Sequence, residues 1–63
     1  MDSFVMELID NLATYLVENK YKENTYIIQP NKDVRFSENA QDQYNNICAE
    51  IETIIFESNL INL

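Results

Sequence analysis

Several residue types that build functional sites are missing from this chain of 63 residues. It contains no histidine, no glycine and no tryptophan, and it has only one cysteine and one proline. Without histidine it cannot form the usual Cys/His zinc site, and without glycine it has no glycine-rich loop to hold a phosphate. The acidic residues match no calcium-loop spacing. The sequence therefore predicts a protein that is not an enzyme and has no catalytic residue, no metal site and no cofactor.

Basic residues are also scarce in this sequence. Four lysines and arginines stand against eleven aspartates and glutamates, which gives a net charge of −7. A charge of this sign repels nucleic acids and anionic membranes and attracts basic surfaces. We therefore expect no direct binding of nucleic acid and no membrane association, but a protein target with a basic surface.

Long apolar runs and export signals are absent as well. No apolar run is longer than three residues, whereas a helix that crosses a bilayer needs about 20. The first residues show neither the basic region nor the cleavage site of a secretory signal. Cys48 is the only cysteine, so a disulfide within the chain is excluded. A reducing cytoplasm is the expected location.

The small size of the chain limits how it can be stabilised. Residues 1–63 form one domain at most, and a domain of this size buries only about 60% of the surface of its unfolded chain. Ordering the chain costs about 1.5 kcal/mol per residue. Because neither an internal disulfide nor a zinc site is available, we expect a very well packed core or self-association. A homodimer is the simplest assembly.

The first expected element is an amphipathic helix from about Ser3 to Lys20. Asp2 or Ser3 provides a cap at its N-terminus. Apolar residues recur at i, i+3, i+4 and i+7 spacing and define one face. This face, which we expect to pack against the rest of the domain, comprises Val5, Leu8, Ile9, Leu12, Tyr15 and Leu16.

A hairpin and a second helix complete the expected fold. Residues 25–29 and 33–37 have the composition and alternation of strands, and the only proline favours a turn between them. A second helix is expected to begin near Ser37 or Asn39 and to run to about Ser58 or beyond. Its apolar face comprises Tyr44, Ile47, Cys48, Ile51, Ile54, Ile55 and Ile61. The sequence thus predicts an α+β, two-layer αββα domain in which both helices cover one face of the hairpin.

Some apolar residues lie outside these two faces. At about 100° per residue they form a second apolar side on each helix, which a monomer of two helices and two strands cannot fully cover. Exposed apolar patches mark interfaces. We therefore predict a homo-oligomer interface formed by Met6, Ala13, Val17, Ala49, Phe56, Leu60 and Leu63. The alternatives are a hairpin that wraps far enough to cover these residues and a frayed C-terminus.

Acidic and aromatic residues form the expected partner-binding surface. Carboxylates on the outer sides of both helices imitate the phosphates that a nucleic-acid-binding protein recognises, and tyrosine offers a large contact area with few rotatable bonds. The predicted residues are Glu7, Asp10, Glu18, Tyr21, Tyr26, Asp42, Glu50 and Glu57. The alternative is a solvated surface without a partner. Tyr15 and Tyr44 are expected at the edge of the core, and Cys48 inside it.

The combination of small size, acidity, aromatic residues and missing catalytic groups resembles a type of protein rather than one family. Bacteriophages and mobile elements produce such proteins as anti-restriction, anti-CRISPR and other anti-defence inhibitors. The resemblance implies a stoichiometric inhibitor that occludes a defence or nucleic-acid-processing protein in the host cytoplasm. The alternatives are an antitoxin or immunity protein that neutralises a cognate basic partner, and a structural or assembly accessory protein.

Overall fold

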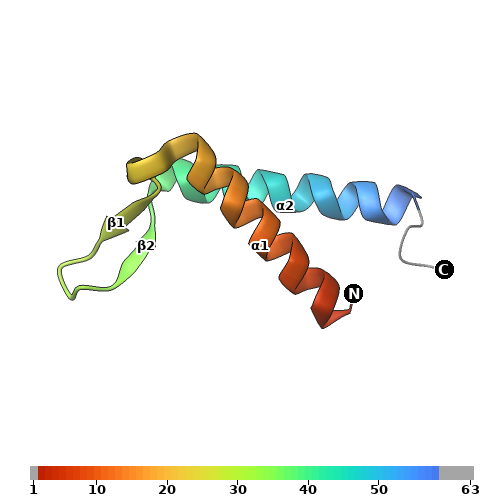
Figure 1. Cartoon of the computed structure of the whole chain (residues 1–63), viewed down its shortest axis with the longest axis horizontal. Helices are drawn as coiled ribbons and strands as arrows, with labels where there is room; N and C mark the ends of the chain where they lie inside the picture. The colour runs from red at the N-terminus through yellow and green to blue at the C-terminus, as the bar shows by residue number, and fades with distance from the viewer. Residues whose placement is uncertain (1, 59–63) are drawn as a thin grey trace.

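The order of elements along the chain is the one predicted from the sequence. The computed structural model describes residues 2–58 and shows two helices that flank a two-stranded antiparallel hairpin (Figure 1). This arrangement confirms the α+β helix–hairpin–helix fold class. The elements are α1 (Ser3–Tyr21), the 3-10 helix η1 (Lys22–Asn24), β1 (Tyr26–Ile28), β2 (Val34–Phe36) and α2 (Glu38–Ser58).

Both helices begin at side-chain caps. The Asp2 carboxylate accepts a hydrogen bond from the Phe4 backbone N–H at 3.1 Å, as expected of an N-cap. Ser37 Oγ accepts one from the Ala40 N–H at 3.4 Å and donates one to the Asn24 carbonyl oxygen at 2.8 Å. The start of α2 is therefore tied to the segment that follows α1, and this tie brings the two helices together at one end of the domain.

The hairpin is shorter than the sequence suggests, because each strand has only three residues. Tyr26 pairs with Phe36, and Ile28 pairs with Val34. Residues 29–33 form the connection. The tightest hairpin turns favour glycine, and a chain without glycine makes a longer loop instead.

The core is small and lies where the two helices cross. The buried residues of the described chain are Ile9, Ala13, Val17, Thr25 and Ala40. Ala13 and Ala40 are both fully covered, and small side chains at a crossing let two helices approach closely. Thr25 is satisfied inside the core, because its hydroxyl donates to the Lys22 carbonyl oxygen at 2.6 Å.

The prediction of which residues of α1 face inwards is wrong for most of them. Ala13 and Val17, which the sequence assigns to an oligomer interface, are 0% exposed within the chain's own fold, whereas Leu8 and Leu12 are 57% and 46% exposed. Of the predicted face only Ile9 is buried. The buried side of α1 holds Ile9, Ala13 and Val17, which recur every four residues, and periodicity alone does not separate it from the neighbouring apolar side of the same helix. Because they are buried, Ala13 and Val17 have no free surface for a second copy.

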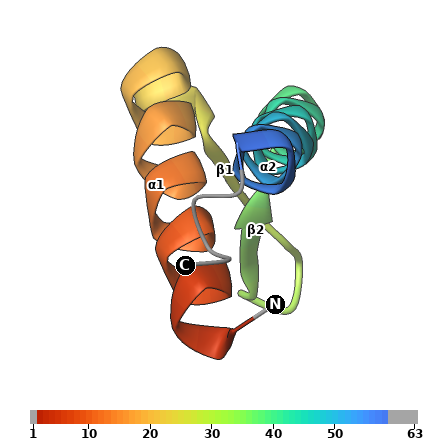
Figure 2. The ribbon, with the colours of Figure 1, turned by 90° about the vertical axis from the view of Figure 1, so that its right-hand side faces the viewer.

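The predicted inward face of α2 has the right direction but is only half covered. Its half-buried members are Tyr44, Ile47, Cys48, Ile51 and Ile55. Ile54 is 60% exposed, and Ile61 lies outside the described residues. Figure 2, which looks nearly along α2, shows α1 crossing it rather than running beside it. Helix α1 therefore lies close to the first turns of α2 and diverges from it towards the C-terminal end of α2 (Figure 1).

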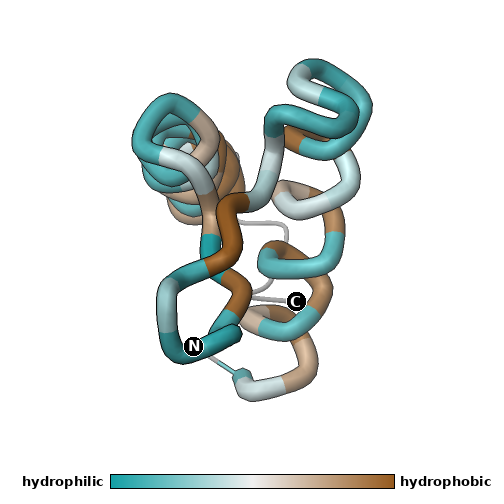
Figure 3. The backbone as a smooth tube through the Cα atoms, turned by 90° about the vertical axis from the view of Figure 1, so that its left-hand side faces the viewer, coloured by the Kyte–Doolittle hydropathy of each residue, from teal (hydrophilic) through white to brown (hydrophobic). Residues whose placement is uncertain are grey.

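The domain is elongated rather than spherical. Its radius of gyration is 13.7 Å and its extents are 46 × 20 × 14 Å, whereas a compact domain of this length has a radius of gyration of about 11 Å. The hairpin extends away from the helix crossing instead of lying beneath both helices (Figure 1). Figure 3 shows hydrophobic residues in this hairpin, and Ile28 and Val34 are largely exposed. The described chain thus leaves apolar surface uncovered on several sides.

Candidate functional site

A row of aromatic rings joins the hairpin to α2. Cross-strand pairing places Tyr26 opposite Phe36, and their rings are stacked with centroids 5.4 Å apart. The Phe36 ring in turn packs against Tyr44 of α2 at 5.3 Å. Aromatic pairs at such distances contribute about 0.5–1.5 kcal/mol beyond the area they bury. The row therefore fixes the base of the hairpin on α2.

The hydroxyl groups of this row bind two carboxylates of α1. Tyr26 Oη donates to Glu18 Oε2 at 2.7 Å, and Tyr44 Oη donates to Asp10 Oδ1. The hydrogen bond to Asp10, followed by burial, raises the pKa of Tyr44, and the hydrogen bond to Glu18 raises the pKa of Tyr26. Both tyrosines thus remain donors at neutral pH. Asp10 and Glu18, which the sequence assigns to partner binding, also connect the helices and the hairpin.

Two side chains expected in or near the core are more exposed than predicted. Tyr15 is 61% exposed on the outer side of α1, because α1 turns its small residues inwards. Cys48 is half-buried rather than inside the core. Tyr44 does lie at the edge of the core, where it is half-buried.

The outer side of α2 carries a row of carboxylates. Asp42, Glu50 and Glu57 are exposed and lie within a sector of about 80°, roughly 80–180° round the helix from the core-facing Ala40 and Ile51. Spacings of eight and seven residues separate them by about 12 and 10 Å along the axis. We call these three residues the acidic row. They are the part of the predicted partner-binding set that lies on α2.

Helix α2 holds most of the net charge of the protein. It contains five acidic residues and no basic residue, a net charge of −5, whereas α1 has three acidic residues and one lysine, a net charge of −2. The C-terminal end of a helix dipole attracts cations, yet the last turn of α2 has no basic residue. The acidic row therefore has no countercharge on its own helix.

The remaining predicted partner-binding residues lie on α1. Glu7 is exposed and shares one side of the helix, within about 80°, with Asp10 and Glu18. Tyr21 is half-buried at the last residue of α1, and the Lys20 ammonium lies 5.4 Å from the centre of its ring. The structure thus divides the predicted set into a group on α1 and β1 and the acidic row of α2.

The residues predicted for the oligomer interface do not form one surface. Met6 and Phe56 are exposed at 55% and 63%, and Ala49 is exposed as well. Met6 lies on the same side of α1 as the buried Ala13 but beyond the crossing, whereas Phe56 lies roughly 140° round α2 from Ile51. Leu60 and Leu63 lie outside the described residues. Phe56 and Ala49 instead border the acidic row.

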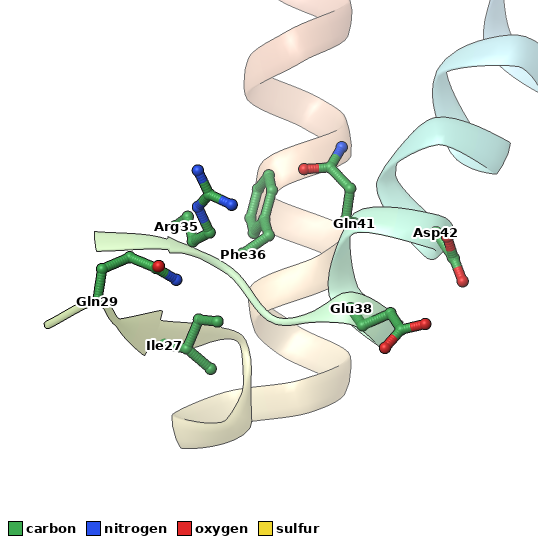
Figure 4. Close-up of a pocket in the computed structure, with 7 residues that line it drawn as sticks. All are labelled: Ile27, Gln29, Arg35, Phe36, Glu38, Gln41 and Asp42. Atoms are coloured by element: carbon green, nitrogen blue, oxygen red, sulfur yellow. The ribbon is translucent and has the colours of Figure 1, made fainter. Parts of the chain in front are cut away.

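A pocket with a volume of about 530 Å³ lies between the hairpin and the first turns of α2 (Figure 4). Its lining includes Ile27, Arg35 and Phe36 from the strands and Glu38 and Asp42 from α2. One guanidinium and two carboxylates give it no uniform charge. In the described part of the chain no three side chains are grouped so that they could hold a metal ion. Sequence reasoning missed this hollow, because it exists only when the hairpin is folded against α2.

Comparisons with protein-family models, with curated proteins and with solved structures found no match for this chain. Neither helix, as far as the structure describes them, is long and apolar enough to span a membrane. The function therefore has to be inferred from the geometry and charge of the chain itself.

Proposed function

We propose that this protein is a non-enzymatic inhibitor that binds and occludes a basic surface of another protein through the acidic row of α2. The observation that carries this proposal is the row itself: three exposed carboxylates on one side of a helix that contains no basic residue. A partner rich in lysine and arginine supplies the countercharge that the helix lacks.

The position of the acidic row on the helix strengthens its attraction for cations. Glu57 lies in the last turn of α2, where the aligned peptide dipoles already produce a negative potential. Binding of cationic side chains at this end relieves repulsion in the free protein and adds attraction in the complex. Such charge pairs increase the association rate and the specificity more than the affinity.

Apolar residues beside the acidic row are suited to supply the remaining affinity. Phe56 is 63% exposed, and it borders the row together with the exposed Ala49. Aromatic residues are frequent among those that dominate binding energies, provided that neighbouring contacts exclude water from them. We therefore assign Phe56 to the partner contact rather than to self-association.

The target that fits this surface best is a nucleic-acid-binding protein, because its basic surface is built to neutralise successive phosphates. Occupation of that surface by carboxylates blocks the nucleic acid without any chemical step. We place this encounter in the cytoplasm, where the single Cys48 stays reduced. A phage-type inhibitor of a host defence or nucleic-acid-processing protein acts in this way, and so does an antitoxin or immunity protein that neutralises a basic partner.

Affinity capture with two charge-matched variants tests the proposal. The row variant is D42N/E50Q/E57Q, and the control variant is E7Q/E23Q/E38Q. Each variant loses three negative charges, but only the first loses the acidic row. We expect the wild type and the control to retain the same basic protein from a cell lysate at about 0.05 M salt. Retention should fall at about 0.3 M salt, because salt screens the charges.

Reconstitution with the purified captured protein then measures the mechanism. The wild type should displace nucleic acid from that protein stoichiometrically, and the row variant should bind it at least about tenfold more weakly. Equal weakening by both variants would show that only the net charge matters. If no basic protein is retained at low salt, the proposal fails.

A further inference from the structure

Helix α1 has a second apolar face that is largely exposed in the described chain. Val5, Leu8, Leu12 and Tyr15 follow one another at intervals of three and four residues, and together they lie about 120° round the helix from the buried Ala13. Leu8, Leu12 and Tyr15 are exposed, and Val5 is half-buried. We call these four residues the outer seam. Since one side of α1 already forms the core, the seam is left for an external contact.

The spacing of the outer seam is that of a two-stranded coiled coil. In such pairs, apolar residues at the a and d positions of a heptad face those of a partner helix. Continuing the pattern, the next a position after Tyr15 is Asn19, which is exposed. A single asparagine at an a position fixes the register and the two-stranded state of coiled coils. The pattern therefore indicates a helix as the partner of the seam.

The outer seam is also the uncharged side of an acidic protein. Together with its neighbours Phe4, Asn11 and Asn19 it spans about 120° of the helix circumference, and none of these residues is charged. The outer seam offers no carboxylate to a basic partner, whereas the acidic row offers three. Two copies of a chain with a net charge of −7 can meet on this side without placing carboxylates in the contact. The charge distribution thus favours a second copy as the occupant.

The exposed side chains supply a large part of the area that a dimer needs. Phe4, Leu8, Leu12 and Tyr15 are between 46% and 69% exposed, and Leu16 beside them is 40% exposed. Large aromatic side chains bury about 150–250 Å² each, so five large side chains uncovered to about half offer several hundred Å². A standard interface buries about 800 Å² per partner. The elongated shape, with a radius of gyration of 13.7 Å, agrees with a chain that is completed by another copy.

From the spacing, the charge and the area together, we propose that this protein is a homodimer in which the outer seams of two copies pack against each other as a short two-helix coiled coil. Self-association then uses α1 and not the Met6 and Phe56 surface predicted from the sequence. It leaves the acidic row of α2 free for a different partner. The inference does not rest on the proposed inhibitory function, because the two surfaces lie on different helices.

Sedimentation equilibrium with matched variants tests the dimer. L8E/L12E places two charges in the outer seam, and M6E/F56E places two charges at similarly exposed apolar positions outside it. We expect the wild type and M6E/F56E to have the mass of two copies, and L8E/L12E to have the 7.4 kDa mass of one. D42N/E50Q/E57Q should keep the dimer mass, so that a failure of this inference is distinguishable from a failure of the proposed function.

Disulfide trapping covers the case in which L8E/L12E does not fold. In a Cys48→Ala background, Leu12→Cys should give a covalently linked dimer on oxidation, because Leu12 lies in the seam. Ala49→Cys, at an exposed position of α2, should remain unlinked under the same conditions. Linking through Ala49→Cys but not through Leu12→Cys would place the contact on α2 and overturn the inference.

Three further results would contradict the dimer through the outer seam. The first is a wild-type mass of one copy up to a concentration of about 1 mM, which is well above the dissociation constant of a stable dimer. The second is a dimer that M6E/F56E separates and L8E/L12E leaves intact. The third is a chain that dimerises only after residues 59–63 are removed, since the outer seams of two intact chains would then not pack against each other.

Discussion

The outer sides of α1 and α2 differ in the kind of contact that they support. The two helices have similar lengths, 19 and 21 residues, and each has a fully buried alanine. Away from the crossing, α1 presents the uncharged outer seam and α2 presents the acidic row. Removing apolar surface from water is favourable. Removing a carboxylate from water is costly unless a cation pairs with it. A fold too small to cover its helices thus keeps two surfaces with different chemistry.

The largest expected effect comes from a charge on the inner side of α1. Val17 is fully buried, so Val17→Asp places an unpaired charge in the core and should lower the free energy of unfolding by about 3 kcal/mol or more. That is a large part of the stability of a small domain. Circular dichroism should show loss of helix at 25 °C in this variant. Leu12→Asp, on the outer side, should keep its helical signal. Equal loss in both variants would contradict the assignment of the inner and outer sides.

A somewhat smaller effect should appear in the dependence of stability on concentration. If the outer seam joins two copies, the melting temperature of the wild type should rise with protein concentration, because association stabilises the folded state by mass action. A hundredfold increase above the dissociation constant contributes roughly 2–3 kcal/mol. Thermal melts of L8E/L12E should not depend on concentration. If the melting temperature of the wild type does not depend on concentration, the outer seam does not join two copies.

Breaking the link between the helices should have an intermediate effect that depends on pH. Tyr44 donates to Asp10, and this bond raises the pKa of Tyr44 above its ordinary value of 10.0. Because the folded-state pKa is the higher one, the bond stabilises the fold fully below pH 10.0 and less as the pH rises further. Tyr44→Phe should cost about 1 kcal/mol at neutral pH.

Denaturant titrations at neutral and at alkaline pH measure this link. The free energy of unfolding of the wild type should fall above pH 10.0, and Tyr44→Phe should show less of this fall. Because the pKa of Tyr26 is raised as well, by its hydrogen bond to Glu18, some dependence should persist in the variant. The same alkaline loss in both proteins would mean that Tyr44 does not contribute.

The smallest expected effect distinguishes the ends of the helix dipoles. Glu57→Gln removes a negative charge near the C-terminal end of α2 and should raise the free energy of unfolding by about 0.3–0.5 kcal/mol at low salt. Asp2→Ala at the start of α1 should instead lower it by about 1 kcal/mol, because the N-cap is lost. Thermal melts at low and high salt should show that only the Glu57 effect disappears on screening. Destabilisation by Glu57→Gln would show that this carboxylate has a partner within the fold.

Sequence reasoning succeeded for α2 and failed for the orientation of α1. Helix α2 has one dominant apolar stripe, including Ile47 and Ile51, and its opposite side is acidic, so periodicity indicates which side turns inwards. Helix α1 is apolar on two sides, and the side with the larger residues, such as Leu8 and Leu12, faces outwards. Periodicity identifies apolar sides but does not decide which of two meets a neighbouring helix. The side with Ile9, Ala13 and Val17 faces the core, and contact with the rest of the fold decides this.

The candidate sites show the same division. The acidic row could be predicted, because Asp42, Glu50 and Glu57 share a side of any regular helix with this sequence. The hydrogen bond between Tyr26 and Glu18 could not, because it depends on where the hairpin meets α1. Neither could the hollow beside Arg35, which needs the hairpin to lie against α2.

Local composition and spacing alone determined the order helix, hairpin, helix, the capping of α1 by Asp2 and the concentration of five negative charges on α2, because each of these properties depends on neighbouring residues. Only the tertiary structure decided that Ala13 and Val17 lie inside while Leu8 and Leu12 remain outside. That choice depends on which side of α1 meets α2, and this contact joins residues that are distant in the chain and come together only in the folded molecule.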